Sequence, residues 1–295
     1  LAKRSYTKVD ENGYIDNENS ITVMQWNILS QAIGYTCDRF DTCAEKDLLW
    51  SSRKWKIIYE IAQYMPLDVI CLQEVDHYDF IERMLIKVGY RGTFTPKPDS
   101  PCYYISGNTG PDGCAIFYNA SRLTLLKSSS RILQVFECES NQVVLNCKFK
   151  CKSTGKVFCV STTHLKARKG PMLSFLRDEQ GKDIVDFLDN ESGTTPTIIT
   201  GDFNAEPCEP VYDTITSKYE SAYFTALGDE PLYTNWTKRV GEEEMKQTID
   251  YVFYSPENFE VKSVLDLNAQ HINSPLPNSQ YASDHLSLVA QFHFK

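Results

Sequence analysis

The chain lacks several features that would place it in a simple class of protein. None of its apolar runs approaches the roughly 18 residues that a membrane-spanning helix needs. No Cys-x-x-Cys pair occurs, which argues against a zinc knuckle or a thioredoxin-type site. There is no internal repeat, no low-complexity tract and no linker rich in Pro, Gly and Ser. We therefore expect no spanning helix, no small metal-knuckle module and no obvious domain boundary.

Positive charge is also scarce. Thirty Lys and Arg residues stand against 39 Asp and Glu, which gives a net charge of −9. A protein that grips a long nucleic-acid backbone usually shows a basic face. Any basic patch on this chain must therefore be local.

What is present is typical of a globular protein. The 295 residues are 42% hydrophobic and 23% charged, which excludes a fully disordered chain, a collagen and a coiled-coil rod. A chain of this length makes one large domain or two small ones.

Ten cysteines are many for this length. Cys71, Cys114 and Cys159 lie inside apolar, strand-like runs, so we expect buried, reduced thiols that pack as small hydrophobic groups. Reduced thiols favour a cytoplasmic location. The sequence begins with Leu1 rather than Met, so we expect a missing N-terminal piece, which would carry any mitochondrial leader.

The pattern along the chain predicts a mixed α/β fold in which helices cover sheets. Residues 1–20 are polar, and we expect a loosely held arm there. Strands are expected at residues 21–29, 67–73, 113–118, 142–150, 157–163, 197–200, 248–254, 261–265 and 286–294, and helices at 51–65, 78–88 and 173–188. Gly181 should weaken the last helix.

Six short segments share one layout, in which polar residues follow an apolar strand. They are Trp26-Asn27, Gln73-Glu74, Thr163-His164, Gly201-Asp202-Phe203-Asn204, Thr248-Ile249-Asp250-Tyr251 and Ser283-Asp284-His285. Each segment alone is a weak signal, because a single His or Asn at a strand end is more often structural. Together they supply carboxylates, histidines and asparagines but no cysteine, a set that suits Mg²⁺ or Mn²⁺ rather than zinc.

The order of these six segments resembles the endonuclease/exonuclease/phosphatase superfamily. That resemblance implies a two-sheet α/β/β/α sandwich with one catalytic cleft and a single catalytic domain over residues 21–295. Longer motifs are similar to the nocturnin family within its deadenylase-like branch, namely residues 24–29, 71–77, 92–98, 110–115, 163–168 and 201–207.

The resemblance also implies a role for each matching residue. Glu74 is expected to be the main Mg²⁺ ligand, with Asn27 beside it and Asp284 assisting; Mn²⁺ is a possible substitute. Asp202 would take a proton from the attacking water or orient it, and Asn204 would position that water. The remaining roles concern the phosphate: His285, oriented by Asp250, would stabilise its charge, and His164 would touch it.

Members of the nocturnin family remove the 2′-phosphate from NADP⁺ and NADPH, so that activity is the expected one for this chain. A local cluster of Lys97, Lys166, Arg168 and Arg239 would suit the additional phosphates of this dinucleotide. The alternative is a 3′-exoribonuclease that shortens poly(A), for which RNA would be the partner. We expect a monomer without membrane insertion.

Two other classes stay open at this point. A catalytically idle interaction protein could use the same fold, but it would tolerate losses in the catalytic set, which is intact here. A secreted nuclease would require paired cysteines. A phosphatase of inositol phosphates is disfavoured, because the sequence around Asp202 and Asp250 does not resemble that branch.

Overall fold

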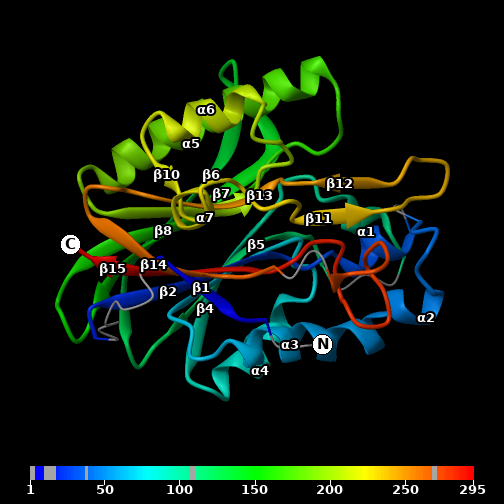
Figure 1. The fold of residues 1–295 in the computed structure, drawn as a ribbon. Helices are drawn as coiled ribbons and strands as arrows, with labels where there is room; N and C mark the ends of the chain where they lie inside the picture. Colours follow the sequence, from blue (N-terminus) through cyan, green and yellow to red (C-terminus); the bar gives the residue numbers. More distant parts are fainter. Residues whose placement is uncertain (1–3, 10–17, 37–38, 107–109, 268–270) are drawn as a thin grey trace.

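The computed structural model describes residues 4–9, 18–36, 39–106, 110–267 and 271–295. Two large β-sheets stack face to face, and helices cover their outer faces (Figure 1). The first sheet has the strand order β1-β14-β15-β2-β3-β5-β4. Its strands are β1 (Tyr6–Lys8), β2 (Ser20–Asn27), β3 (Val69–Gln73), β4 (Tyr90–Pro96), β5 (Gly113–Asn119), β14 (Phe259–Leu265) and β15 (Leu288–Phe294).

The second sheet has the order β10-β13-β9-β8-β7-β6. Its strands are β6 (Leu123–Val135), β7 (Cys138–Cys151), β8 (Val157–His164), β9 (Thr197–Asp202), β10 (Glu220–Ser221) and β13 (Asp250–Tyr254). A separate hairpin joins β11 (Asn235–Thr237) to β12 (Met245–Gln247).

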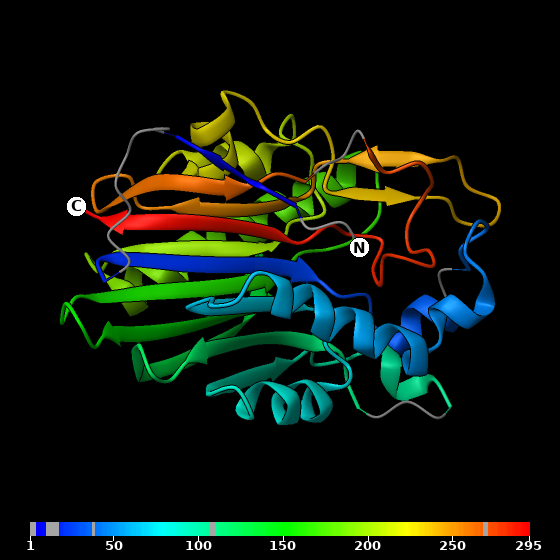
Figure 2. The ribbon, with the colours of Figure 1, turned by 60° about the horizontal axis from the view of Figure 1, so that its bottom comes forward.

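The chain forms seven α-helices and one 3₁₀ turn in the described residues. They are α1 (Gln31–Thr36), α2 (Glu45–Leu48), α3 (Trp50–Gln63), α4 (Tyr78–Ile86), the 3₁₀ turn η1 (Pro101–Tyr104), α5 (Pro171–Ser192), α6 (Pro210–Thr216) and α7 (Ala222–Leu227). Helices α3 and α4 lie against the first sheet, and α5 and α6 lie against the second (Figures 1 and 2).

Both faces of each sheet are covered, because successive side chains along a strand point to opposite faces of the sheet. In β3, Val69 belongs to the core between the sheets, and Ile70 belongs to the core beneath α3 and α4. In β9, Ile198 faces the other sheet and Ile199 faces α5 and α6. The expected α/β/β/α sandwich is confirmed.

The expected strands and helices are present, with shifted ends, but several elements are additional. The 13-residue β6 alternates too irregularly in hydrophobicity to stand out, and β4 carries mostly half-buried residues. The short helices α6 and α7 cover too few residues to show a helical repeat.

Gly181 lies inside α5 and does not break it. A Cβ added at Gly181 would lie 2.6 Å from Cγ2 of Val211 on α6. The glycine therefore allows α5 and α6 to approach closely.

The expectation of a loosely held arm is wrong for residues 4–8. Strand β1 pairs with β14, and Arg4 is buried. The Arg4 guanidinium donates to the carbonyl of Ser287 at 2.9 Å and to the carboxylate of Glu60 at 2.6 Å. Residues 1–3 and 10–17, also part of the expected arm, lie outside the described residues.

The expectation of buried, reduced thiols holds for Cys71, Cys114 and Cys159, which are buried and free. All nine cysteines in the described part of the chain are free. Within the same residues, no helix is long and apolar enough to cross a membrane.

Candidate active site

The polar strand ends converge at the end of the sandwich that carries α1 and the β11–β12 hairpin (Figure 1). Two parallel pairs create this convergence. Strand β2 runs beside β3, with Asn27 opposite Gln73, and β8 runs beside β9, with His164 opposite Asp202. Strand β13 returns antiparallel to β9 and places Asp250 opposite Asp202.

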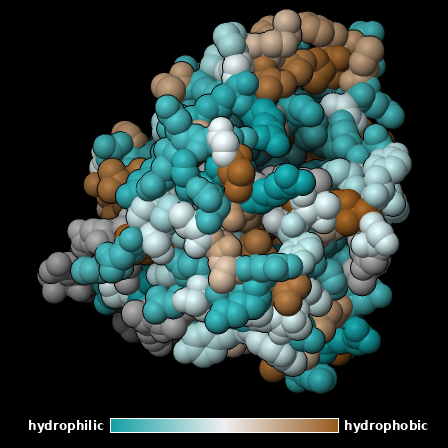
Figure 3. All heavy atoms as spheres, turned by 90° about the vertical axis from the view of Figure 1, so that its right-hand side faces the viewer, coloured by the Kyte–Doolittle hydropathy of each residue, from teal (hydrophilic) through white to brown (hydrophobic). Residues whose placement is uncertain are grey.

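A cleft of about 590 Å³ opens at this end. Figure 3 views this end of the molecule, where hydrophilic residues predominate around a hollowed centre. Ten of the twelve site residues expected from the sequence line the cleft: Glu74, Lys97, His164, Lys166, Arg168, Asp202, Asn204, Arg239, Asp284 and His285. The other two, Asn27 and Asp250, lie behind the lining and contact residues in it.

Glu74 follows β3 with a backbone φ of 56°, in the left-handed region that non-glycine residues rarely adopt. Its carboxylate accepts hydrogen bonds from Asn27 Nδ2 at 3.0 Å and from the backbone N–H of Ser30 at 2.9 Å. Burial alone would raise the pKa of Glu74, but the electrostatic interactions with His164 and Lys97 and these hydrogen bonds lower it to about 2. Glu74 is therefore a half-buried carboxylate that is ionised at neutral pH.

Asn27 is oriented differently from what a metal ligand requires. Its Nδ2 also donates to Asp202 Oδ2 at 2.9 Å, while its Oδ1 accepts the backbone N–H of Leu29 at 3.0 Å. The amide thus bridges the carboxylates of Glu74 and Asp202 and presents no oxygen to the space between them. In this structure Asn27 positions the two carboxylates.

Asp202 ends β9 and is 2% exposed. Its Oδ1 accepts the backbone N–H of Asn204 at 2.9 Å, and its Oδ2 lies 3.5 Å from His164 Nε2 and 3.7 Å from His285 Nε2. Burial raises the pKa of Asp202, against the opposing effect of the two histidines. A raised pKa makes this carboxylate a better proton acceptor than a solvated one.

Asn204 adopts a φ of 52°, and its Nδ2 donates to the carbonyl of Leu165 at 3.1 Å. Its side chain is therefore held at the cleft wall, next to the residue that follows β8.

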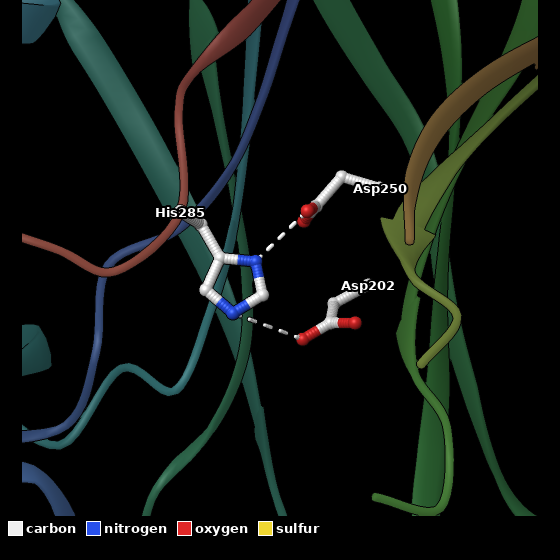
Figure 4. Close-up of side chains that lie close together, drawn as sticks. All are labelled: Asp202, Asp250 and His285. Carbon is white, nitrogen blue, oxygen red and sulfur yellow. Dashed lines mark hydrogen bonds and ion pairs between the residues drawn. The ribbon is translucent and has the colours of Figure 1, made fainter. Parts of the chain in front are cut away.

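His285 lies between two aspartates (Figure 4). Its Nδ1 is 2.8 Å from Asp250 Oδ2, and the carboxylate of Asp250 is fixed by Gln25 at 3.1 Å and Thr234 at 2.7 Å. Burial alone would lower the pKa of His285, but Asp250, with Asp284 and Asp202, raises it well above the ordinary value. His285 is thus an oriented imidazolium whose Nε2 faces the cleft side of the site.

His164 and Lys97 form a second buried pair. Lys97 Nζ lies 3.3 Å from His164 Nδ1 and 2.9 Å from Asp112 Oδ2. Burial and the charge of Lys97 lower the pKa of His164. Lys97 is therefore a fixed internal charge at the floor of the cleft, not a solvated side chain.

The other basic residues reach the cleft from its rim. Lys166 and Arg168 are exposed, and Arg168 pairs with Glu242 at 3.1 Å. Arg239 Nη2 lies 3.3 Å from Asp284 Oδ2. The predicted basic cluster thus lines one cleft, but Arg168 and Arg239 already contact carboxylates.

The donor set fits a hard divalent cation. The Glu74 carboxylate is ionised, and no Lys, Arg or His nitrogen of the described residues lies within 4 Å of it. Atoms of Asp202, Asp250 and His285 also lie within 4.8 Å of one another. In that second group, His285 Nδ1 is occupied by its contact with Asp250. Glu74 is therefore the more suitable place for the cation, and Asp284 also lines the cleft.

Sequence reasoning missed three residues of the cleft neighbourhood. Asp112 is fully buried and pairs with Lys97; its place in a loop rich in Gly and Pro gave no sign of burial. Asn235 donates to Asp284 Oδ2 at 3.3 Å, and Glu242 closes the rim over Arg168. The hairpin that carries Asn235 and Glu242 is distant in sequence from their partners, so no local pattern could indicate these contacts.

Comparison with known proteins places this geometry in context. The model of the Endonuclease/Exonuclease/phosphatase family matches residues 24–285. Nocturnin of Drosophila melanogaster is 46% identical over 301 residues, which cover 93% of this chain and 47% of that protein. Nocturnin of Xenopus laevis is 43% identical, with 92% of this chain and 72% of that protein covered. The chain therefore spans between about half and three quarters of the length of these relatives.

Among solved structures, the human Nocturnin catalytic domain with a bound sulfate anion superposes with a TM-score of 0.82 and 39% identity. The match covers 99% of this chain and 97% of that one.

Proposed function

Because this chain belongs to the endonuclease/exonuclease/phosphatase family and, within it, to the nocturnin group, we propose that it is a Mg²⁺-dependent hydrolase that removes the 2′-phosphate from NADP⁺ and NADPH. The observation that supports this substrate most directly is the arrangement of charge around the cleft. Lys97, Lys166, Arg168 and Arg239 line one enclosed space on a chain of net charge −9.

A compact dinucleotide suits this cluster better than a polymer does. NADPH carries a 2′-phosphate and a pyrophosphate close together, which several convergent cations can contact at once. A poly(A) strand needs phosphate contacts spaced along a groove. The cleft is instead also lined by Glu242 and Glu243, whose negative charges would repel the phosphate groups of an extended RNA strand.

The proposed reaction is attack of water on the phosphorus atom, with departure of the ribose 2′-oxygen. Asp202 accepts the proton of the water, a role that suits its raised pKa and its buried position. Asn204 lies beside Asp202 and helps to orient the water. His285, held by Asp250, donates from Nε2 to the phosphoryl oxygens and stabilises their negative charge.

Glu74, with Asp284 assisting, is the proposed holder of the Mg²⁺ ion, and Asn27 keeps the Glu74 carboxylate in place. When bound, the ion would supply charge neutralisation at the phosphoryl group, a contribution of several kcal/mol. Lys97 and His164 provide additional donors at the cleft floor.

The test is a parallel assay of phosphate release from NADPH and of the length of oligo(A), with Mg²⁺ and with chelator, using purified protein and Asp202→Ala as the inactive control. We expect Mg²⁺-dependent phosphate release from NADPH while oligo(A) stays intact. Shortening of oligo(A) that is lost in Asp202→Ala, without phosphate release from NADPH, would instead establish a deadenylase.

A further inference from the structure

We infer that Arg177 is a positioning residue for the basic loop of the cleft, which we define as residues 165–169. In this view Arg177 fixes the backbone of the loop so that the side chains of Lys166 and Arg168 are ready to meet the phosphate groups that are not cleaved. The inference rests on the proposed function, because it assigns a role to substrate phosphates beyond the 2′-phosphate.

One nitrogen of the Arg177 guanidinium contacts this loop. The side chain projects from α5 and is 1% exposed. Its Nη1 donates to two backbone carbonyls, that of Lys166 at 3.0 Å and that of Arg168 at 2.8 Å. The carbonyls therefore belong to the two residues whose side chains carry the positive charge into the cleft.

The other edge of the same guanidinium binds Glu209. Nη2 and Nε donate to Glu209 Oε2 at 2.5 and 3.2 Å. Glu209 precedes α6 and accepts the backbone N–H of Glu206 at 3.4 Å, in the segment that follows Asn204. Because a guanidinium is planar and rigid, one side chain links the basic loop to the segment that leads into α6.

Further bonds hold the loop from the protein side. The backbone N–H of Lys166 donates to Gln180 Oε1 at 3.1 Å, and that of Leu165 donates to the carbonyl of Asp202 at 2.9 Å. Arg168 has a φ of 84°, a strained conformation for a residue with a side chain. Such strain persists only where the surroundings impose it.

This arrangement has a consequence for binding. A cationic loop that is free to move loses conformational entropy when it closes on a substrate, and that loss weakens binding. Here the backbone is fixed beforehand, while Lys166, Ala167, Arg168 and Lys169 remain exposed. Arg177 should therefore influence the affinity for substrates that reach the loop, and not the chemistry at the cleaved phosphate.

The experiment compares NADPH with adenosine 2′-monophosphate, which has the cleaved group but lacks the pyrophosphate. Arg177→Lys keeps a positive charge beside Glu209 but loses the fork that reaches both carbonyls. We expect the KM for NADPH to rise about tenfold, the loss typical of one weakened charge-assisted contact. The kcat for NADPH, and both constants for adenosine 2′-monophosphate, should stay at the wild-type values.

Arg122→Lys is the matched control. Arg122 binds Asp68 at 2.5 Å and the carbonyl of Ser20 at 2.6 Å, at the ends of β3 and β2 opposite the cleft. Arg122→Lys should leave kcat and KM for both substrates at the wild-type values. Glu209→Gln provides a second test if Arg177→Lys does not fold, because Arg177 remains and loses only its charged partner; we expect a smaller change in the same direction.

The outcomes separate the two hypotheses. If wild-type protein releases no phosphate from NADPH, the proposed function is wrong, and the role of Arg177 fails with it. If wild-type protein is active but the variants change the KM values of both substrates equally, or change neither value, the proposed function stands and the positioning role is refuted. A lowered melting temperature with an unchanged ratio of the two KM values would identify Arg177 as a purely structural residue.

Discussion

Replacing Glu74 by Gln keeps the shape of the side chain and removes its charge. In the native protein the pKa of this carboxyl is lowered from 4.5 to about 2, against the effect of burial, chiefly by His164 and Lys97. At about 1.36 kcal/mol per tenfold change, this lowering corresponds to about 3 kcal/mol in favour of the ionised form. The fold therefore maintains a negative charge at a place where it is costly, as a cation site requires.

Two effects should follow from Glu74→Gln. A bound metal typically contributes several kcal/mol to phosphoryl transfer, so kcat should fall by at least about 10³-fold at saturating Mg²⁺. The second effect does not depend on catalysis. At about 100 times its dissociation constant, Mg²⁺ stabilises the native state by about 2.7 kcal/mol. Thermal melting should show this stabilisation in the wild type and not in the variant.

Glu230→Gln is the control for a lost carboxylate. Glu230 is half-buried, accepts the hydroxyl of Tyr212 at 2.8 Å and does not line the cleft. The Glu230→Gln variant should retain both turnover and the Mg²⁺-dependent rise in melting temperature. An equal rise in Glu74→Gln, or turnover close to that of the wild type, would refute the assignment of Glu74 to the metal.

Three further predictions follow from the same geometry. Asp202→Asn should lower kcat roughly 10²- to 10⁴-fold with little change in KM, the range for a lost general base; a raised KM with normal kcat would make Asp202 a binding residue. Asp250 raises the pKa of His285, so Asp250→Asn should let His285 lose its proton at lower pH. The alkaline limb of the pH–rate profile should therefore shift to lower pH, and a limb at the wild-type pH would contradict this. Gly181→Ala should lower stability by about 1–2 kcal/mol in denaturant unfolding, because the added methyl meets Val211 and this overpacking outweighs the gain in helix propensity; a stability gain would contradict the close approach.

The amino-acid sequence by itself determined the layers of this protein and the chemical types of residue in the cleft. The strand at 67–73 is recognisable because its central residues 69–72 are apolar and the segment lies between Pro66 and Glu74. The polar residues that follow the strands indicate which edge of the sheets carries the site. Such patterns are local, since they reflect which side chains water excludes and where a strand ends.

Only the tertiary structure decided how the site residues are used. Asn27 turns its amide nitrogen toward Glu74 and Asp202, because the backbone N–H of Leu29 occupies its oxygen. Lys97 is buried against Asp112. Arg4, which belongs to the segment expected to form a loose arm, is buried and pairs with Glu60. Apart from the Leu29 N–H, the partners in these roles lie 15 to 175 positions away in the sequence, and a hydrogen bond or an ion pair over such a separation exists only once the strands have been brought side by side.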